Sequence, residues 1–427
     1  MSSFLIQGGS RLEGEVQVSG AKNAILPILA ATVLGAGKIS LSRVARLSDV
    51  KVMRDVLTDL GANVIWDRDR MIVDTSYLDS CQIPEKLMSQ MRASIFLMGP
   101  LLGRYGKVEI SQPGGCSIGP RPIDLHLKGL KALGAKFEQK HGTLLAQADK
   151  LTGAKIDLDF PSVGATENIM MAAVRAEGKT VISNAAKEPE IINLQNFLNR
   201  MGANITGAGT PEIKIKGVKQ LHPVEYEIIP DRIEASTFLV AGAISKGNIF
   251  IKNIIPEHIE AILSKLSEIG VKIRVGKDWV KLLGVDNYQA VDLKTMPYPG
   301  FPTDVQAQFM SLLALAQGNS LIKENIFENR LRHAEELRRM GADIIIESNT
   351  AIVKGVDRLS GAKVEAMDLR AGAALVLAGI AAEGETVVEK IYHIDRGYEN
   401  FADKLTKLGA NIVRIEKQKV SSKTGND

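Results

Sequence analysis

The feature that most constrains this chain is a unit of about 70 residues that occurs six times within its 427 residues. Each unit carries a glycine directly after an apolar stretch, which is the usual stop signal at the end of a helix. These glycines, separated by 73, 68, 68, 71 and 68 residues, are Gly61, Gly134, Gly202, Gly270, Gly341 and Gly409. A second marker, a glycine followed by a short strand pattern, begins at Gly37, Gly106, Gly178, Gly247, Gly318 and Gly384. Two independent markers with one period predict six copies of one supersecondary unit.

Each unit begins with a helix that is apolar on all sides, and such a helix is buried. We expect these helices at 24–34, 94–102, 169–176, 235–244, 307–316 and 371–382. A short strand follows, then an amphipathic helix, then a hairpin, such as 344–346 and 351–353 around a turn at Ser348 and Asn349. This βαβαββ-like order predicts an α/β fold in layers with the apolar helices inside.

The sixth unit is incomplete at the end of the chain, where only 412–415 reads as a strand. Residues 1–21 hold two strand patterns that belong to no unit, so we expect them to complete the sixth. Six units exceed one core, so two domains of three units are the simplest division. We predict one domain at 22–229, a second at 1–21 plus 230–416, and a disordered tail at 417–427. The chain then crosses between the domains twice, which predicts a hinge.

The starts of the apolar helices carry residue types that often have functions. If the units are related by rotation, these starts gather at one end of each domain, where free backbone amides suit an anion. They hold Lys22, Asn23, Arg92, Ser162, Val163, Gly164, Asp231, Asp304 and Arg370. Asp231 and Asp304 are residue types that cap helices. A cation at a helix start opposes the helix dipole, so an anionic ligand would compensate Lys22, Arg92 and Arg370.

The second unit departs from the repeat at a cysteine. It has 28 residues between its two marker glycines, whereas the other units have 23 to 25, and the extra length falls in the loop 112–122. That loop holds three glycines, three prolines, Arg121 and Cys116. A positive, partly exposed setting favours the thiolate of a cysteine. A surface loop with an incidental cysteine is the alternative, but the break in the repeat favours a functional segment.

Composition excludes several classes of protein. The net charge of +4 comes with no basic run that suits nucleic acid, and it is compatible with an acidic small substrate. Two cysteines, Cys81 and Cys116, make no disulfide framework and favour a reducing cytoplasm. The first ten residues do not read as a signal peptide, and the longest apolar run, 373–382, is too short to span a membrane. No cluster with metal-ligand spacing is present, so we expect neither a metal nor an organic cofactor.

Seven motifs along the chain resemble one known family. They are 19–24 (SGAKNA), 91–94 (MRAS), 113–116 (PGGC) with 121–126 (RPIDLH), 162–166 (SVGAT), 301–304 (FPTD), 327–330 (FENR) and 393–397 (HIDRG). Over essentially its whole length the chain resembles the bacterial UDP-N-acetylglucosamine enolpyruvyl transferases. The resemblance implies an inside-out α/β barrel of two three-unit domains, in agreement with the repeat.

The resemblance also implies a reaction and a set of site residues. The family transfers the enolpyruvyl group of phosphoenolpyruvate to the 3′-hydroxyl of UDP-N-acetylglucosamine and releases phosphate, the first committed step of peptidoglycan synthesis. It implies Cys116, Asp304, Lys22 and Arg396 as catalytic residues. Phosphoenolpyruvate would be bound by Lys22, Asn23, Cys116, Arg121, Arg370 and Arg396. The sugar nucleotide would be bound by Asn23, Arg92, Arg121, Pro122, Ile123, Asp124, Leu125, Ser162, Val163, Gly164, Asp304 and Ile326.

The residue types suit this chemistry. Phosphoenolpyruvate carries a phosphate and a carboxylate, for which arginine supplies paired donors. Cys116 is the candidate acid that protonates the methylene carbon, and Asp304 is the candidate base for the sugar hydroxyl. The resemblance further implies covalent modification of Cys116, by phosphoenolpyruvate and by the epoxide fosfomycin. Two positions depart from the family pattern: Phe160 replaces a lysine of some members, and Ser117 replaces a threonine.

Two other functions remain open at this point. The first is the related 5-enolpyruvylshikimate-3-phosphate synthase, which shares the fold and the donor but lacks a cysteine loop of this type. The second is a catalytically silent nucleotide-binding paralogue, in which Lys22, Cys116, Asp304 or Arg396 would be eroded, whereas all four are present. The expected partners are the two small substrates, with no nucleic acid and no membrane insertion.

Overall fold

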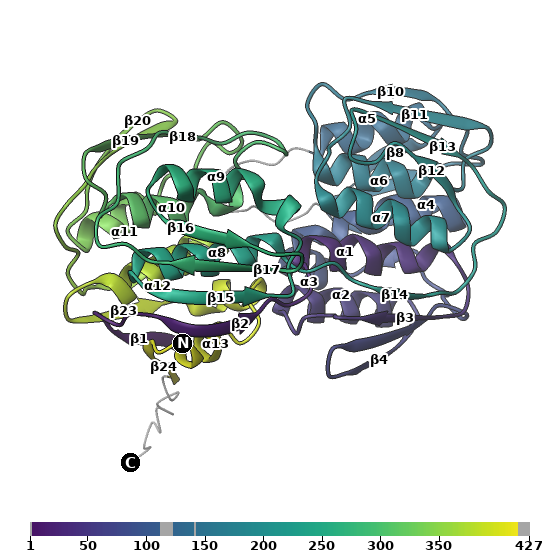
Figure 1. Cartoon of the computed structure of the whole chain (residues 1–427). Helices are drawn as coiled ribbons and strands as arrows, with labels where there is room; N and C mark the ends of the chain where they lie inside the picture. The colour runs from purple at the N-terminus through teal and green to yellow at the C-terminus, as the bar shows by residue number, and fades with distance from the viewer. Residues whose placement is uncertain (1, 112–122, 141, 417–427) are drawn as a thin grey trace, which may run out of the picture.

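The computed structural model describes residues 2–111, 123–140 and 142–416. Its helices and strands form six units in two halves that lie side by side, with both chain ends on the same half (Figure 1). Every unit contributes one sheet of four strands. In each sheet one edge strand pairs in parallel with its neighbour, and the remaining pairs are antiparallel, as in β10–β11–β13–β12. The predicted repeat is therefore confirmed as a βαβαββ unit.

Three units form the half built around residues 21–228. The first consists of β14 (Glu225–Glu227), α1 (Lys22–Ala31), β3 (Lys38–Ser42), α2 (Ser48–Asp59), β4 (Asn63–Asp67) and β5 (Arg70–Asp74). The second consists of β6 (Gln82–Ile83), α3 (Glu85–Gln90), the 3-10 helix η2 (Arg92–Leu97), α4 (Met98–Tyr105), β7 (Lys107–Ser111), α5 (Asp124–Ala132), β8 (Lys136–Lys140) and β9 (Thr143–Gln147). The third consists of β10 (Lys155–Asp157), α6 (Val163–Ala173), β11 (Lys179–Ser183), α7 (Pro189–Arg200), β12 (Asn204–Thr206) and β13 (Glu212–Lys216).

The other three units form the half that holds both ends. The fourth consists of β2 (Glu13–Gln17), α8 (Arg232–Ile244), β15 (Asn248–Lys252), α9 (Glu260–Glu268), β16 (Lys272–Val275) and β17 (Trp279–Leu283). The fifth consists of β18 (Leu293–Lys294), the 3-10 helix η4 (Thr303–Val305), α10 (Gln306–Leu313), β19 (Asn319–Lys323), α11 (Ala334–Arg339), β20 (Asp343–Glu347) and β21 (Thr350–Lys354). The sixth consists of β22 (Lys363–Glu365), α12 (Leu369–Ala381), β23 (Glu385–Glu389), the 3-10 helix η5 (Ile391–Arg396), α13 (Phe401–Lys407), β24 (Asn411–Glu416) and β1 (Ser2–Gln7).

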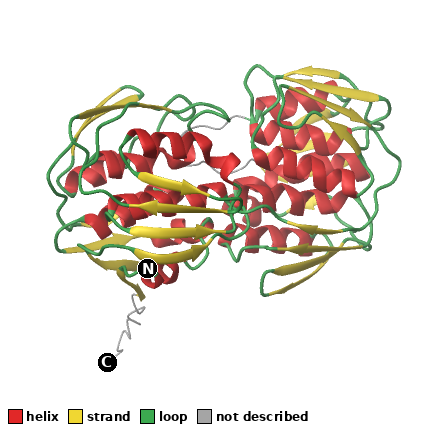
Figure 2. Ribbon diagram, in the orientation of Figure 1, coloured by secondary structure: helices red, strands yellow, loops and turns green. Residues whose placement is uncertain are grey.

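Helices occupy the inside of each half and strands the outside (Figure 2). The first helix of each unit is apolar on all sides, and residues 370–380 of α12 are all buried. The six sheets are separate and open, so the inside-out arrangement is confirmed, whereas their strands do not close into a barrel. The six stop glycines all adopt positive φ, between 92° and 107°, which explains why glycine recurs there.

The prediction that residues 1–21 complete the sixth unit is only half right. Strand β1 lies between β23 and β24 of the sixth unit, but β2 pairs in parallel with β15 of the fourth. Strand β14 likewise returns to pair with β3 of the first unit. The pairing of β2 joins strands that are remote in sequence, which hydrophobic periodicity cannot specify.

Two expected helix positions also need correction. The helix expected at 94–102 is a 3-10 segment followed by α4, which runs from 98 to 105. The helix expected at 169–176 begins earlier, at Val163, because Ser162 caps it. Periodicity finds the apolar middle of a helix better than its ends.

Buried apolar side chains form two clusters, one within residues 21–228 and one from residues 4–18 and 233–412. The two segments that run between them lie against each other. Gly20 and Pro230 form an antiparallel bridge, Ala21 N donates to Ile229 O at 2.8 Å, and Asp231 N donates to Ser19 O at 2.9 Å. A Cβ atom on Gly20 would lie 1.8 Å from Arg43 O, so only glycine fits this crossing.

Candidate active site

Most of the predicted site residues within the described ranges lie at or beside the starts of inner helices. Lys22 opens α1 and Asn23 follows it, while Ser162 caps α6 and is followed by Val163 and Gly164. Arg92 opens η2, Asp304 lies in η4, and Arg370 is the second residue of α12. Five others lie elsewhere: Arg396 ends η5, Ile123 immediately precedes α5, Asp124 and Leu125 are the first two residues of α5, and Ile326 lies in a loop.

One group of charges joins the two halves around Asp49, a residue of α2. Lys22 Nζ lies 2.7 Å from Asp49 Oδ2, and Arg396 Nε lies 2.9 Å from Asp49 Oδ1. Lys22 and Asp49 belong to one half and Arg396 to the other. The Asp49 side chain is only 5% exposed. Burial alone would raise the pKa of Asp49, but Lys22 and Arg396 more than offset this effect and hold it below its usual value.

Burial lowers the pKa of Lys22, and so do Arg370 and Arg396, whereas Asp49 raises it; the net shift is downward. Asp49 therefore supplies at least part of the negative charge that compensates Lys22 at the start of α1. Asp49 and its two partners together still carry one net positive charge. A group with this net positive charge can bind an anionic ligand.

A second group of charges surrounds Asp304. Arg330 Nη2 lies 2.7 Å from Asp304 Oδ1, and Arg370 Nη2 lies 3.2 Å from Asp304 Oδ2. Burial would raise the pKa of Asp304, but Arg370, Arg330 and Arg232 hold it far below its usual value. The carboxylate is therefore ionised throughout the physiological range. Asp304 does not act as the helix cap expected from its position, because its oxygens are engaged with guanidinium groups.

One nitrogen of the Arg370 guanidinium is unsatisfied within the part of the chain that the structure describes. Its side chain is 4% exposed, and its Nη1 atom is buried without a hydrogen-bond partner among the described residues. The aromatic ring of Tyr398 lies below the guanidinium, 5.3 Å from its carbon to the ring centroid. A buried donor of this kind is costly unless a ligand satisfies it. Arg370 thus satisfies the geometric requirement for a residue that contacts a bound anion.

The segments that cross between the halves meet at the carboxylate of Asp231. Asp231 caps α8 through Oδ1, which accepts from Ile233 N at 2.8 Å and Glu234 N at 3.0 Å. Its other oxygen accepts from Lys22 N at 3.1 Å. The start of α1 in one half is thereby fixed against the start of α8 in the other.

The starts of α5 and α6 lie side by side in the first half. A Cβ atom on Gly164 would lie 3.2 Å from His126 Cε1, which shows how closely the two helices approach. Asn168 of α6 donates to Ile95 O at 2.8 Å and accepts from Gly99 N, so η2 and α4 join the same wall. The sequence-predicted residues on this wall are Ile123, Asp124, Leu125, Ser162, Val163 and Gly164.

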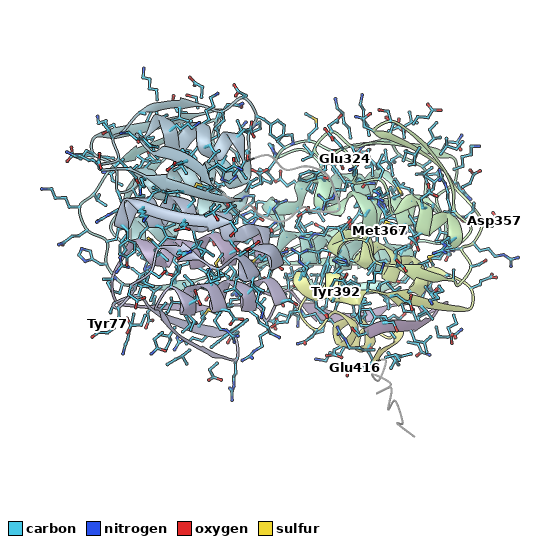
Figure 3. The ribbon with its side chains drawn as sticks, turned by 180° about the vertical axis from the view of Figure 1, so that it is seen from behind. Tyr77, Glu324, Asp357, Met367, Tyr392 and Glu416 are labelled. Carbon is cyan, nitrogen blue, oxygen red and sulfur yellow. The ribbon has the colours of Figure 1, made fainter. Side chains whose placement is uncertain are left out.

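Ile326 is held on the opposite half by a buried carboxylate. Glu324 Oε1 accepts from Ile326 N at 2.8 Å and Phe327 N at 3.1 Å, and its Oε2 accepts from Thr303 Oγ1 at 2.8 Å. Thr303 is adjacent to Asp304, so Glu324 fixes both the loop of Ile326 and the 3-10 helix η4 that holds Asp304. Glu324 is labelled in Figure 3, as is Tyr392 of η5, which lies near the boundary between the halves.

Three predicted residues lie outside the described residues, namely Cys116, Arg121 and Pro122. The expected tail at 417–427 also lies outside them. For Arg92 the backbone is described but the side chain is not. The extra length of the second unit likewise falls in 112–122, between β7 and α5.

Sequence reasoning missed Asp49 and Arg330 as members of the site. Asp49 stands in the first turn of an amphipathic helix, where an acidic residue is ordinary. Its pairing with Lys22 and Arg396 depends on how the two halves meet, which local sequence does not specify. Arg330 belongs to the motif 327–330, so the resemblance marked its neighbourhood but not its contact with Asp304.

Within 2–111, 123–140 and 142–416, no group of three or more His, Cys, Asp or Glu side chains could hold a metal ion. In the same part of the chain, no helix combines the length and apolar character needed to cross a bilayer.

Comparison with known proteins identifies the family. A family model described as EPSP synthase (3-phosphoshikimate 1-carboxyvinyltransferase) matches residues 6–405. A UDP-N-acetylglucosamine 1-carboxyvinyltransferase 1 of Caldanaerobacter subterraneus is 54% identical over 413 residues, which cover 97% of this chain and 99% of the relative. The chain belongs to the EPSP synthase family. Another relative in this family, the UDP-N-acetylglucosamine 1-carboxyvinyltransferase of Desulfosudis oleivorans, is 52% identical over 97% of this chain and 100% of its own length.

Solved structures of the EPSP synthase family share the fold. The enolpyruvyl transferase NikO from Streptomyces tendae superposes with a TM-score of 0.88 at 26% identity, covering 97% of this chain and 98% of NikO. EPSP synthase from Acinetobacter baumannii gives a TM-score of 0.76 at 17% identity, covering 97% of this chain and 100% of that enzyme. The chain is thus a transferase with the inside-out two-half architecture of enolpyruvyl transferases.

Proposed function

We propose that the chain transfers the enolpyruvyl group of phosphoenolpyruvate to the 3′-hydroxyl of UDP-N-acetylglucosamine and releases phosphate. The observation that carries this proposal is identity of more than 50%, over nearly the whole chain, with relatives named UDP-N-acetylglucosamine 1-carboxyvinyltransferase. The reaction would be the committed step of peptidoglycan synthesis, and therefore part of cell-wall growth and division. The proposed compartment is the cytoplasm.

The proposed donor site lies between the two groups of charges. Lys22, Arg370 and Arg396 would bind the phosphate and carboxylate of phosphoenolpyruvate, together with Asn23, Cys116 and Arg121. The net positive charge of each group supports this assignment, and so does Nη1 of Arg370, which has no hydrogen-bond partner among the described residues. Arginine is suited to the task because its planar donors match carboxylate and phosphate oxygens in pairs.

The proposed acceptor site uses the wall formed by α5 and α6 and the loop of Ile326. Arg121, Pro122, Ile123, Asp124 and Leu125 would bind the nucleotide with Ser162, Val163 and Gly164, while Asn23, Arg92, Asp304 and Ile326 would bind the sugar side. The amides at the start of α6 support a place for the diphosphate.

In the proposed chemistry, Cys116 protonates the methylene carbon of the donor and Asp304 removes the proton of the sugar hydroxyl. The hydroxyl oxygen adds to the central carbon of the donor, which becomes tetrahedral. Loss of phosphate and of one methyl proton then restores the double bond in the product. Two arginines keep Asp304 ionised but weaken it as a base. We therefore expect its proton transfer to be concerted with formation of the new C–O bond.

We further propose that the two apolar clusters are the cores of two domains, 22–229 and 1–21 plus 230–416, that close on the sugar nucleotide. The paired crossing at Gly20 and Pro230 supports a hinge there.

The proposed nucleophilic character of Cys116 extends to fosfomycin, an anionic epoxide. The thiolate would open the epoxide ring by forming an S–C bond, and the ring oxygen would take up a proton. We expect one covalent adduct by mass spectrometry on the peptide that contains Cys116. The internal control is Cys81, the chain's only other cysteine, and an adduct there would contradict the assignment.

Phosphate release with alternative acceptors tests the proposed function. Release should require both phosphoenolpyruvate and UDP-N-acetylglucosamine. Release with shikimate 3-phosphate in place of the nucleotide would instead favour the EPSP synthase reaction. No release with either acceptor would favour a silent nucleotide-binding protein.

A further inference from the structure

Asp49, an acidic residue in the first turn of α2, joins two cations that come from different halves of the molecule. An aspartate in the first turn of a helix usually lies at the surface and interacts with the helix dipole. Asp49 is instead 4% exposed, and each of its oxygens contacts a cation that the proposed function assigns to the donor. Arg396 Nη2 also approaches Asp49 Oδ2, at 3.4 Å. The Asp49 carboxylate thus lies between the two cationic side chains of Lys22 and Arg396.

The contact also spans the two halves of the molecule. Lys22 and Asp49 lie on neighbouring helices of one half, whereas Arg396 ends η5 in the other. Two further hydrogen bonds fix η5 and the segment after it to the start of α2. Ser48 Oγ donates to Asp395 O at 3.1 Å, and Arg46 N donates to Glu399 Oε1 at 2.7 Å. Asp49 is the charged centre of this contact.

We propose that Asp49 is a positioning residue that holds Lys22 and Arg396 together, so that one donor anion meets both cations. This inference rests on the proposed function. Without the carboxylate, the cations of Lys22 and of the partly exposed Arg396 would repel each other across the boundary, and the long side chain of Lys22 would have no fixed direction. With the carboxylate present, both side chains lose their conformational entropy when the protein folds, so substrate binding does not have to order them.

The charge of Lys22 gives a readout that a purely structural role would not change. The charged groups facing Lys22 are Asp49 from α2, Arg370 from α12, Arg396 from η5 and Asp231, which accepts from its backbone amide. Among the causes of its pKa shift, burial and the two arginines lower the value, while Asp49 raises it. Removing the Asp49 charge should therefore lower the pKa of Lys22 further. The alkaline limb of donor use should then move to lower pH.

The test compares Asp49→Asn, Asp49→Glu and the wild type in steady-state phosphate release over a range of pH. Asp49→Asn should lower kcat/KM for phosphoenolpyruvate by roughly 10- to 100-fold, the range expected for losing a hydrogen bond to a charged group. Its alkaline limb should shift to lower pH, and affinity for UDP-N-acetylglucosamine in calorimetry should stay within about threefold. Asp49→Glu should return the limb toward the wild-type position.

A matched control is Glu234→Gln, which removes another buried carboxylate paired with a lysine, here Lys404. It should lower the unfolding midpoint without moving the alkaline limb of donor use. The proposal is overturned if Asp49→Asn uses phosphoenolpyruvate as well as or better than wild type, because Asp49 would then merely compete with the donor. It is also overturned if nucleotide binding collapses together with donor use, since Asp49 would then be a general structural residue. Failure of the proposed function itself is distinguishable, because the wild type would then show no nucleotide-dependent phosphate release.

Discussion

Asp231 offers a sharp test of how the two halves are joined, because its two oxygens serve different elements. Oδ1 caps α8 by accepting from Ile233 N and Glu234 N, while Oδ2 accepts from Lys22 N at the start of α1. Replacement by alanine removes both functions at a position that is 4% exposed. We therefore expect Asp231→Ala to destabilise the fold and to loosen the start of α1.

The magnitude follows from the two separate losses. Loss of an aspartate cap costs about 0.5–2 kcal/mol. Loss of a hydrogen bond to a carboxylate costs about 1.5–3 kcal/mol. The free energy of unfolding should therefore fall by roughly 2–5 kcal/mol in Asp231→Ala. Asp231→Ser is the matched control, because serine can cap the helix through one oxygen but has no second oxygen for Lys22 N. It should recover about 1 kcal/mol of the loss.

The assay is urea unfolding followed by tryptophan fluorescence. The chain has two tryptophans, Trp66 in the first unit and Trp279 in the fourth, so Trp66→Phe and Trp279→Phe backgrounds report each half separately. The change should be larger for the half that contains Trp279, to which α8 belongs. A loss below about 1 kcal/mol in Asp231→Ala, or no recovery in Asp231→Ser, would refute this reasoning.

Three further predictions concern domain closure, Cys116 and Glu167. Small-angle scattering should show a smaller radius of gyration when UDP-N-acetylglucosamine is added, and an unchanged radius would count against closure of the two proposed domains. Cys116→Asp should keep substantial activity with a changed pH profile, whereas Cys116→Ala should lose about 10²–10⁴-fold in rate, so equal losses in the two variants would remove Cys116 as the general acid. Glu167, buried with both oxygens unpaired among the described residues, has a pKa raised well above normal by burial and by Glu190 and Glu188. The folded protein therefore keeps this proton to a higher pH than the unfolded chain does. The free energy of unfolding of the wild type should fall relative to that of Glu167→Gln as the pH rises above about 4.3. A difference in unfolding midpoint that is constant from pH 5 to pH 8 would contradict that view.

The sequence was sufficient for the repeat and for the glycines at which the amphipathic helices end. Both glycine markers reflect local physics, because positive φ favours glycine, and all six stop glycines and five of the six strand-marker glycines adopt it. The residues at helix starts, such as Lys22, Ser162 and Arg370, were predicted for the same reason. Their positions depend on the neighbouring residues of their own unit.

What the sequence could not supply is the contact between remote elements. The parallel pairing of β2 with β15 joins residues more than 200 positions apart, and several strands of similar pattern could have taken that edge. Asp49 met Lys22 and Arg396 only because α2 and η5 meet at the boundary between the halves. Asp304 was likewise predicted to be a cap or a base, whereas it pairs with Arg330 from a remote part of its own unit and with Arg370 from the next unit.

The central claim is enolpyruvyl transfer to the sugar nucleotide, and the structure of the product tests it most directly. Purified protein would be incubated with UDP-N-acetylglucosamine and phosphoenolpyruvate labelled with ¹³C at its central carbon, and the product examined by NMR and mass spectrometry. The account predicts one new nucleotide that carries the labelled carbon in a vinyl ether at the sugar 3′-oxygen, together with an equal amount of phosphate. Phosphate release without a labelled nucleotide, or a label attached elsewhere on the sugar, would contradict it.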